Sequence, residues 1–101
     1  MIALVQTTFP DLPTAERLGQ VLVEERLAAC ANLWPCHSVY RWKGVVERGS
    51  EALGQFKTTP ARVDALIARL QALHPYERPA VEWWRAAADT GVQAWIEGEV
   101  S

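Results

Sequence analysis

The segment from Thr59 to Pro75 carries the strongest helical pattern in this 101-residue chain. Thr59-Pro60 is a helix start, with a capping residue followed by a proline suited to the first helical position. Apolar residues then recur at steps of three and four, as the face of a helix requires: Val63, Leu66, Ile67, Leu70 and Leu73. Pro75 ends the pattern, because its ring cannot continue the hydrogen-bond ladder. The four residues from His74 to Glu77 should therefore project from a fixed corner.

Strand and helix patterns precede this segment. Ile2 to Thr8 is a short apolar run that ends in β-branched residues, which predicts a buried strand. Asp11 suits a helix N-cap, with Pro13 tolerated in the first turn, and the apolar spacing then predicts a helix to about Arg26.

A long hairpin is predicted next. The β-branched and aromatic residues after Pro35 favour a strand, and Lys43-Gly44 turns the chain. The return strand begins at Val45, is expected to break at Arg48-Gly49-Ser50, and resumes from Glu51 to Thr58. The two arms together predict a bent hairpin.

The C-terminal part adds one strand and one short helix. Tyr76 and Glu77 are expected to begin a strand that continues from Ala80 to Arg85, and Trp95 is the expected core anchor of the last helix. The order is then β-α-β-β-α-β plus a terminal helix. This order predicts an α+β fold, the ferredoxin-like split βαβ sandwich, with one antiparallel sheet and two helices on one face, as a single domain over residues 1–101.

The composition excludes several classes of partner. The net charge is −2 and no basic stripe is present, so nucleic acid is not an expected partner. No apolar run is long enough to span a membrane, and the first residues lack the charged region of a signal peptide, which together predict a cytoplasmic protein. Two cysteines, Cys30 and Cys36, make no disulfide framework and should be thiols there.

Four side chains are candidate ligands for a soft or borderline metal such as copper: Cys30, Cys36, His37 and His74. Cys30 follows two alanines, and we favour a small buried apolar role for it. Cys36 and His37 share a turn where both could be exposed, but neighbours on an extended backbone point to opposite faces. His74 either caps the last helical carbonyls, with its charged form stabilised by the helix dipole, or serves as a metal ligand or acid-base group.

No pattern of an enzyme with a strong nucleophile is present. The sequence has neither a glycine-rich phosphate loop nor a Gly-x-Ser-x-Gly elbow. Ser50-Glu51 with His74 could form an esterase-like group of catalytic residues. A single histidine without a defined orienting carboxylate is weak evidence for such a group. A protein that is not an enzyme is expected.

Five segments in register resemble the CutA family, the divalent-cation tolerance proteins. They are Glu25-Arg26-Leu27-Ala28-Ala29-Cys30-Ala31-Asn32, Ser38-Val39-Tyr40-Arg41-Trp42-Lys43-Gly44, Ser50-Glu51, Lys57-Thr58 and His74-Pro75-Tyr76-Glu77. The resemblance implies a ferredoxin-like fold, a homotrimer whose sheets join across subunits, and a cytoplasmic or periplasmic role in tolerance of copper and other divalent cations. It also implies a departure, because copper-binding members carry a cysteine at the position of Thr7, and some carry a second histidine at the position of Leu73.

The resemblance also favours a polar cleft between subunits. Its lining residues would be Tyr40, Glu51, Lys57, Tyr76 and Glu77. Lys57 would bind an anionic group, and Glu77 with His74 would orient that group or a metal such as Cu(II) or another divalent cation. The plainer alternative has Tyr76 packed at an interface and Glu77 paired with Lys57 or an arginine. The leading hypothesis is a trimeric metal-tolerance protein. The alternatives are a trimeric small-molecule or anion sensor resembling the nitrogen-regulatory signal proteins, and a structural scaffold.

Overall fold

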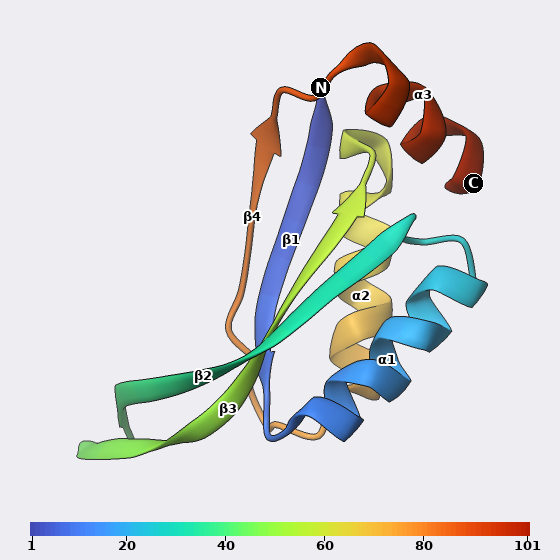
Figure 1. Ribbon diagram of the computed structural model, residues 1–101. Helices are drawn as coiled ribbons and strands as arrows, with labels where there is room; N and C mark the ends of the chain where they lie inside the picture. The colour runs from blue at the N-terminus through green and yellow to red at the C-terminus, as the bar shows by residue number, and fades with distance from the viewer.

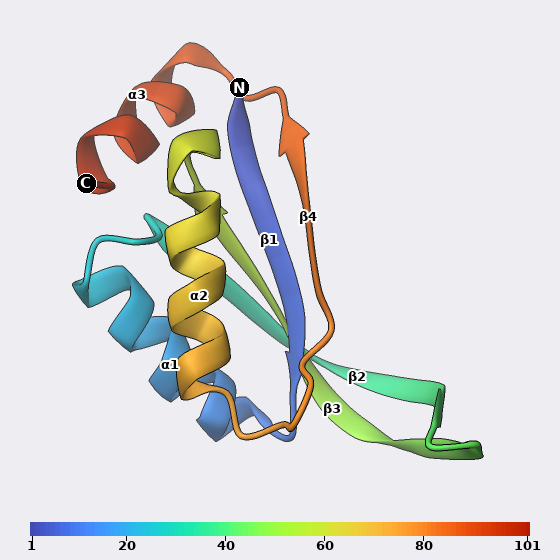
Figure 2. The ribbon, with the colours of Figure 1, turned by 180° about the vertical axis from the view of Figure 1, so that it is seen from behind.

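A computed structural model describes all residues from Met1 to Ser101. The elements in order are β1 (Ile2–Phe9), α1 (Leu12–Glu24), β2 (Cys30–Trp42), β3 (Val45–Thr58), a 3₁₀ turn (Pro60–Arg62), α2 (Val63–Leu73), β4 (Val81–Ala86) and α3 (Thr90–Glu99). The strands form one sheet in the order β2-β3-β1-β4, and each neighbouring pair is antiparallel. Helices α1 and α2 cover one face and leave the other bare (Figures 1 and 2). The predicted α+β sandwich is confirmed.

The core lies between the sheet and these two helices. Along β1, alternate residues are buried against the helices, among them Val5 and Phe9, while Leu4, Gln6 and Thr8 on the bare face are partly exposed. This alternation follows from the two-residue period of a strand. Leu22 of α1 and Leu66 and Leu70 of α2 are fully buried opposite the sheet, as their helical spacing predicts.

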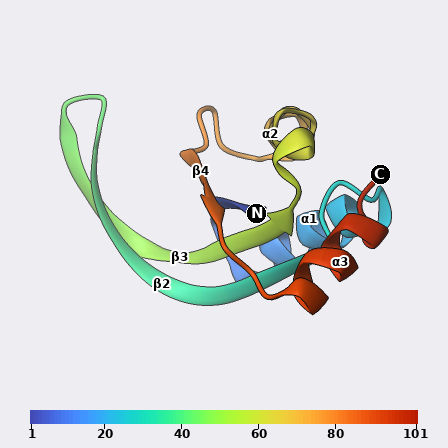
Figure 3. The same cartoon turned by 90° about the horizontal axis from the view of Figure 1, so that it is seen from above.

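The β2–β3 hairpin extends far beyond the sheet and curls, as the view from above shows (Figure 3). Its outer part, residues 37–50, is called the arm below. The tip is the predicted turn, where Lys43 and Gly44 have φ of 50° and 82°, as two-residue hairpin turns require. No intramolecular layer covers the arm, and all residues of its return strand up to Ser50 are exposed.

The predicted break at Arg48-Gly49-Ser50 is wrong, because β3 is continuous through it. Ser38 pairs with Gly49 and His37 with Ser50, so the ladder is kept and the ribbon bends instead. The other strand also starts earlier than predicted and runs through Pro35. A proline is tolerated there because β2 is an edge strand, whose outer side has no ladder bond to lose.

The start and end of α2 differ in how well they were predicted. Thr59 makes no side-chain cap, and Pro60 opens a 3₁₀ turn before the α-helix begins at Val63. The predicted end is confirmed, since the His74 N–H makes the last bond, to the Leu70 carbonyl at 2.9 Å. Tyr76 lies in a loop and does not begin a strand; β4 starts only at Val81.

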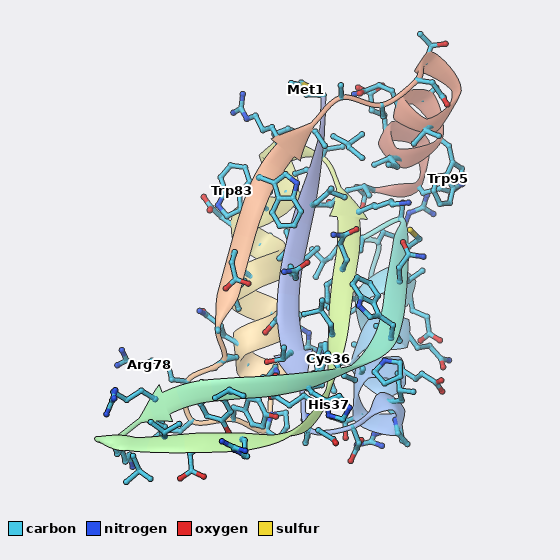
Figure 4. All side chains as sticks on the ribbon, turned by 60° about the vertical axis from the view of Figure 1, so that its left-hand side comes forward. Met1, Cys36, His37, Arg78, Trp83 and Trp95 are labelled. Carbon is cyan, nitrogen blue, oxygen red and sulfur yellow. The ribbon has the colours of Figure 1, made fainter.

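The terminal helix α3 is present, but its predicted anchor is wrong. Ile96 is fully buried against Ile2 and Ala29, whereas the side chain of Trp95 is 45% exposed. Figure 4 shows Trp95 pointing away from the sheet. One residue turns a helix by about 100°, so the neighbour of an anchor faces elsewhere. The Arg26 guanidinium donates to the carbonyls of Gly98 and Glu99 and holds the end of α3.

Candidate functional site between the arm and the loop after α2

A cavity of about 900 Å³ lies between the arm and the loop that follows α2. Its volume is within the range of small-molecule sites. The arm supplies one wall and the loop the other, with β1 and β3 contributing one residue each. The lining residues are Thr8, the run from His37 to Trp42, Glu51, and the run from Pro75 to Ala80.

Three side chains, those of His74, Tyr76 and Glu51, connect β1, β3 and the loop beside this cavity; Tyr76 and Glu51 line it, and His74 does not. His74 is 8% exposed and stacks on Phe9, with ring centroids 5.0 Å apart. Its Nδ1 accepts from the Tyr76 N–H at 3.1 Å, so the proton sits on Nε2, which donates to the Thr8 carbonyl at 2.8 Å. The Tyr76 hydroxyl donates to Oε2 of Glu51 at 2.6 Å. Both ring nitrogens of His74 therefore have partners.

The surroundings set the protonation of these groups. Burial lowers the pKa of His74, and the bond to the Thr8 carbonyl and the charge of Glu51 offset only part of this effect. The predicted stabilisation of charged His74 at the helix end is therefore outweighed. Burial, with the hydrogen bond to Glu51, raises the pKa of Tyr76. At neutral pH His74 is neutral and Tyr76 is a proton donor.

The tip of the arm makes a second connection to the loop. Lys43 Nζ lies 3.4 Å from Oε2 of Glu77 and 5.5 Å from the centre of the Trp42 ring. Both charged side chains are largely exposed, so this ion pair is weak. Glu77 is thus paired with neither Lys57 nor an arginine, because the curl of the arm brings Lys43 to it.

The structure brings together Tyr40, Glu51, Tyr76 and Glu77 but places Lys57 elsewhere. Lys57 follows Glu51 by six residues on β3, about 20 Å at the rise of a strand. Its strand neighbours are Leu4 and Cys30, at the other end of the sheet.

The candidate metal ligands do not gather in one place. His37 is exposed on the cavity wall, whereas Cys36 is absent from the lining and has its Sγ 3.9 Å from the Ser38 hydroxyl. Figure 4 shows both where the arm leaves the sheet. Cys30 is partly exposed, where we expected burial, and desolvation raises its pKa. No group of three or more His, Cys, Asp or Glu side chains could hold a metal ion within one chain.

Two arginines that the sequence did not single out also line the cavity. Arg41 comes from the arm and Arg78 from the loop, and Figure 4 shows Arg78 beside the end of β2. The available signal was their position, since Arg41 belongs to a motif already quoted, and Arg78 directly follows another, which ends at Glu77.

Comparison with known proteins decides the family. A family described as CutA1 divalent ion tolerance protein matches residues 3–99. The chain belongs to the CutA family. The divalent-cation tolerance protein CutA of Thermotoga maritima is 42% identical over 78 residues, 77% of each chain.

Solved CutA structures share the fold over almost the whole chain. CutA from Xylella fastidiosa has a TM-score of 0.93 at 40% identity, covering 99% of this chain and 98% of that one. The periplasmic divalent cation tolerance protein CutA from Archaeoglobus fulgidus has a TM-score of 0.96 at 28% identity, covering 100% of both chains. No helix of the present structure is long and apolar enough to cross a membrane.

Thr7, where the resemblance implied a cysteine in copper-binding members of the family, is unsuited to metal here. Thr7 is 1% exposed and faces the helices, and its hydroxyl has no hydrogen-bond partner. A buried hydroxyl is a poor ligand for copper, which prefers imidazole and sulfur. Thr8, not Thr7, borders the cavity.

Proposed function

We propose that this protein acts as a homotrimer in tolerance of divalent metal ions, copper foremost, binding the metal weakly and performing no enzymatic reaction. The match to the divalent ion tolerance family over residues 3–99 carries the proposal. The two free thiols favour the cytoplasm as its place of action, where such groups remain reduced.

Support for a homotrimer comes from surface that a single chain leaves uncovered. The arm exposes 69% of Val39, 57% of Val45 and 55% of Val46. Such an apolar surface is typical of a protein interface. Strands β2 and β4 are also free edges, which can pair with the edges of another copy.

Support for weak metal binding comes from the ligands that remain free. The His37 side chain makes no hydrogen bond and is exposed, whereas a metal at His74 would have to displace the Tyr76 N–H or the Thr8 carbonyl. Cys36 directly precedes His37, and its thiol could also bind the metal if the backbone adjusted. Because one chain offers too few ligands for a closed site, copies of His37 from several subunits would complete the coordination of Cu(II).

Calorimetric titration of the full chain with Cu(II) tests this site. His37→Asn should weaken binding at least tenfold, Cys36→Ser should weaken it less, and His74→Asn should change it little. Binding should also weaken on acidification, since an imidazole ligand must be neutral. Absence of Cu(II) binding by the intact protein, or binding that His37→Asn leaves unchanged, would contradict the proposal.

A second candidate function is small-molecule sensing, and the cavity favours it. Its walls come from two segments, the arm and the loop. The Lys43–Glu77 ion pair joins them, and the Tyr76–Glu51 hydrogen bond joins the loop to β3 just beyond the arm. A ligand between these walls would alter how the arm is held, and the arm is the surface that we assign to assembly.

A further inference from the structure

The face of the sheet opposite α1 and α2, called the bare face below, is covered at one end only. Ile96 of α3 is buried there against Ile2, with Leu4 partly buried beside them, and Figure 1 shows α3 at the end of the sheet where β1 begins. No helix covers the middle of this face, and the side chains of Gln6 and Gln55 are partly exposed there.

Strand pairing places one lysine and one glutamate on the bare face. Lys57 pairs with Leu4, and Glu82 pairs with Gln6. Directly paired residues of antiparallel strands point to the same side of a sheet, so both charges lie on the side of Leu4 and Gln6. Two strand spacings and two residues separate Lys57 from Glu82, about 12 Å between Cα atoms. The ion pairs of the chain include neither residue.

Two tryptophans lie on the same face at its opposite edges. Trp34 of β2 and Trp84 of β4 are each 39% exposed, and they pair with Leu53 and Leu4. Aromatic rings are enriched in protein interfaces, whereas unpaired charges are costly to bury. A partner that covers both rings would also cover the two charges between them. That partner must therefore present an anion to Lys57 and a cation to Glu82.

A second copy of this chain meets that requirement. Its own bare face offers a glutamate and a lysine, so each copy supplies the charge that the next one lacks. The sheet has different strands at its two edges, β2 and β4, so copies around a threefold axis meet through unlike parts and close a ring of identical contacts.

We propose that the bare faces pack against one another in the homotrimer, and that Lys57 of each copy forms an ion pair with Glu82 of the next copy. This inference rests on the proposed homotrimer and adds a second contact surface to the arm. It also gives a role to Lys57, which lies outside the cavity.

Charge reversal with sedimentation velocity tests the pair. Lys57→Glu and Glu82→Lys each bring like charges together, so each should weaken trimer association at least tenfold. The double variant restores opposite charges in reversed order and should recover the trimer. Arg17→Glu, a reversal at an exposed position of α1, is the control and should remain trimeric. Far-ultraviolet circular dichroism should be unchanged in all four variants.

Two results would overturn the inference while leaving the homotrimer in place. One is wild-type association in both single variants, and the other is a double variant that does not recover the trimer. A monomeric wild type would instead contradict the proposed homotrimer, and the ion pair with it.

Discussion

His74 is held between two backbone groups, and each bond fixes one ring nitrogen. Nδ1 must be unprotonated to accept from the Tyr76 N–H, and Nε2 must be protonated to donate to Thr8. Adding a proton would place two N–H groups face to face at Tyr76. The residue therefore stabilises the site in its neutral form, between Phe9 on one side and the Tyr76 ring on the other.

Acidification should destabilise the protein through this residue. The pKa of His74 is lowered on folding from its usual value of 6.5, so below that pH the unfolded chain binds more protons than the native one. The contribution is complete above pH 6.5 and is lost as the pH falls through the native pKa. Urea unfolding from pH 8 to pH 5, at constant protein concentration, should show this decline, and His74→Gln should flatten it. His37→Gln is the matched control, and an equal slope in wild type and His74→Gln would refute the assignment.

At the scale of elements, β3 is one strand with two environments. From Ala52 onward alternate residues are fully buried under the helices, whereas Val45 to Ser50 are all exposed on the arm. A glycine lies in each half, and each meets different surroundings. A Cβ at Gly54 would lie 2.7 Å from Phe9 Cε2, while a Cβ at Gly49 would meet nothing within 4 Å.

Gly54→Ala and Gly49→Ala form a matched pair for this difference. Gly54→Ala should destabilise the fold by about 1–3 kcal/mol, because the Phe9 ring must move in a packed core. Gly49→Ala should change the free energy of unfolding far less, and denaturant unfolding of both variants measures the contrast. Equal losses would mean that the arm is packed as closely as the core.

The elements that could be predicted from sequence are those with local signals. The spacing of Val63 to Leu73 and the stop at Pro75 predicted α2 correctly, and Lys43-Gly44 predicted the hairpin turn. The break at Gly49 was wrong because a glycine marks either a break or a bend, and only the pairing with Ser38 distinguishes them. The prediction that Trp95 anchors the last helix was wrong, because α3 is short and the orientation of this helix depends on the contacts of Ile96 with Ile2 and Ala29.

At the scale of the whole molecule, the arm gives the chain its elongated shape. The longest dimension is 44 Å, about twice the other two. Apolar residues on the arm cannot reach the core of their own chain, so only a partner molecule could bury them, and we propose that this partner is another copy. The arm is also a wall of the cavity, so under the proposed assembly a ligand in the cavity would contact the surface that joins the copies.

Charge on the arm should break the assembly without unfolding the chain. Val39→Asp with Val46→Asp places two carboxylates on side chains that a single chain exposes by more than half, so the fold should be retained. Sedimentation velocity should then show a trimer for wild type and a monomer for the variant, with unchanged far-ultraviolet circular dichroism. Val23→Asp, on an α1 side chain that is 36% exposed, is the control and should remain trimeric. A trimer that survives both arm substitutions would place the interface elsewhere.

The sequence alone determined the order of the elements, the ferredoxin-like arrangement and the family, because periodicity, caps and turns are local and the five motifs are contiguous. The site was decided by tertiary structure. His74 contacts Thr8 across 66 residues and Tyr76 contacts Glu51 across 25. The curl of the arm brings Lys43 to Glu77, whereas Lys57 lies six residues beyond Glu51 on β3 and outside the site. These contacts are set by strand register and by the bending of the hairpin. Register and bending in turn depend on long-range strand pairing that no local sequence pattern encodes.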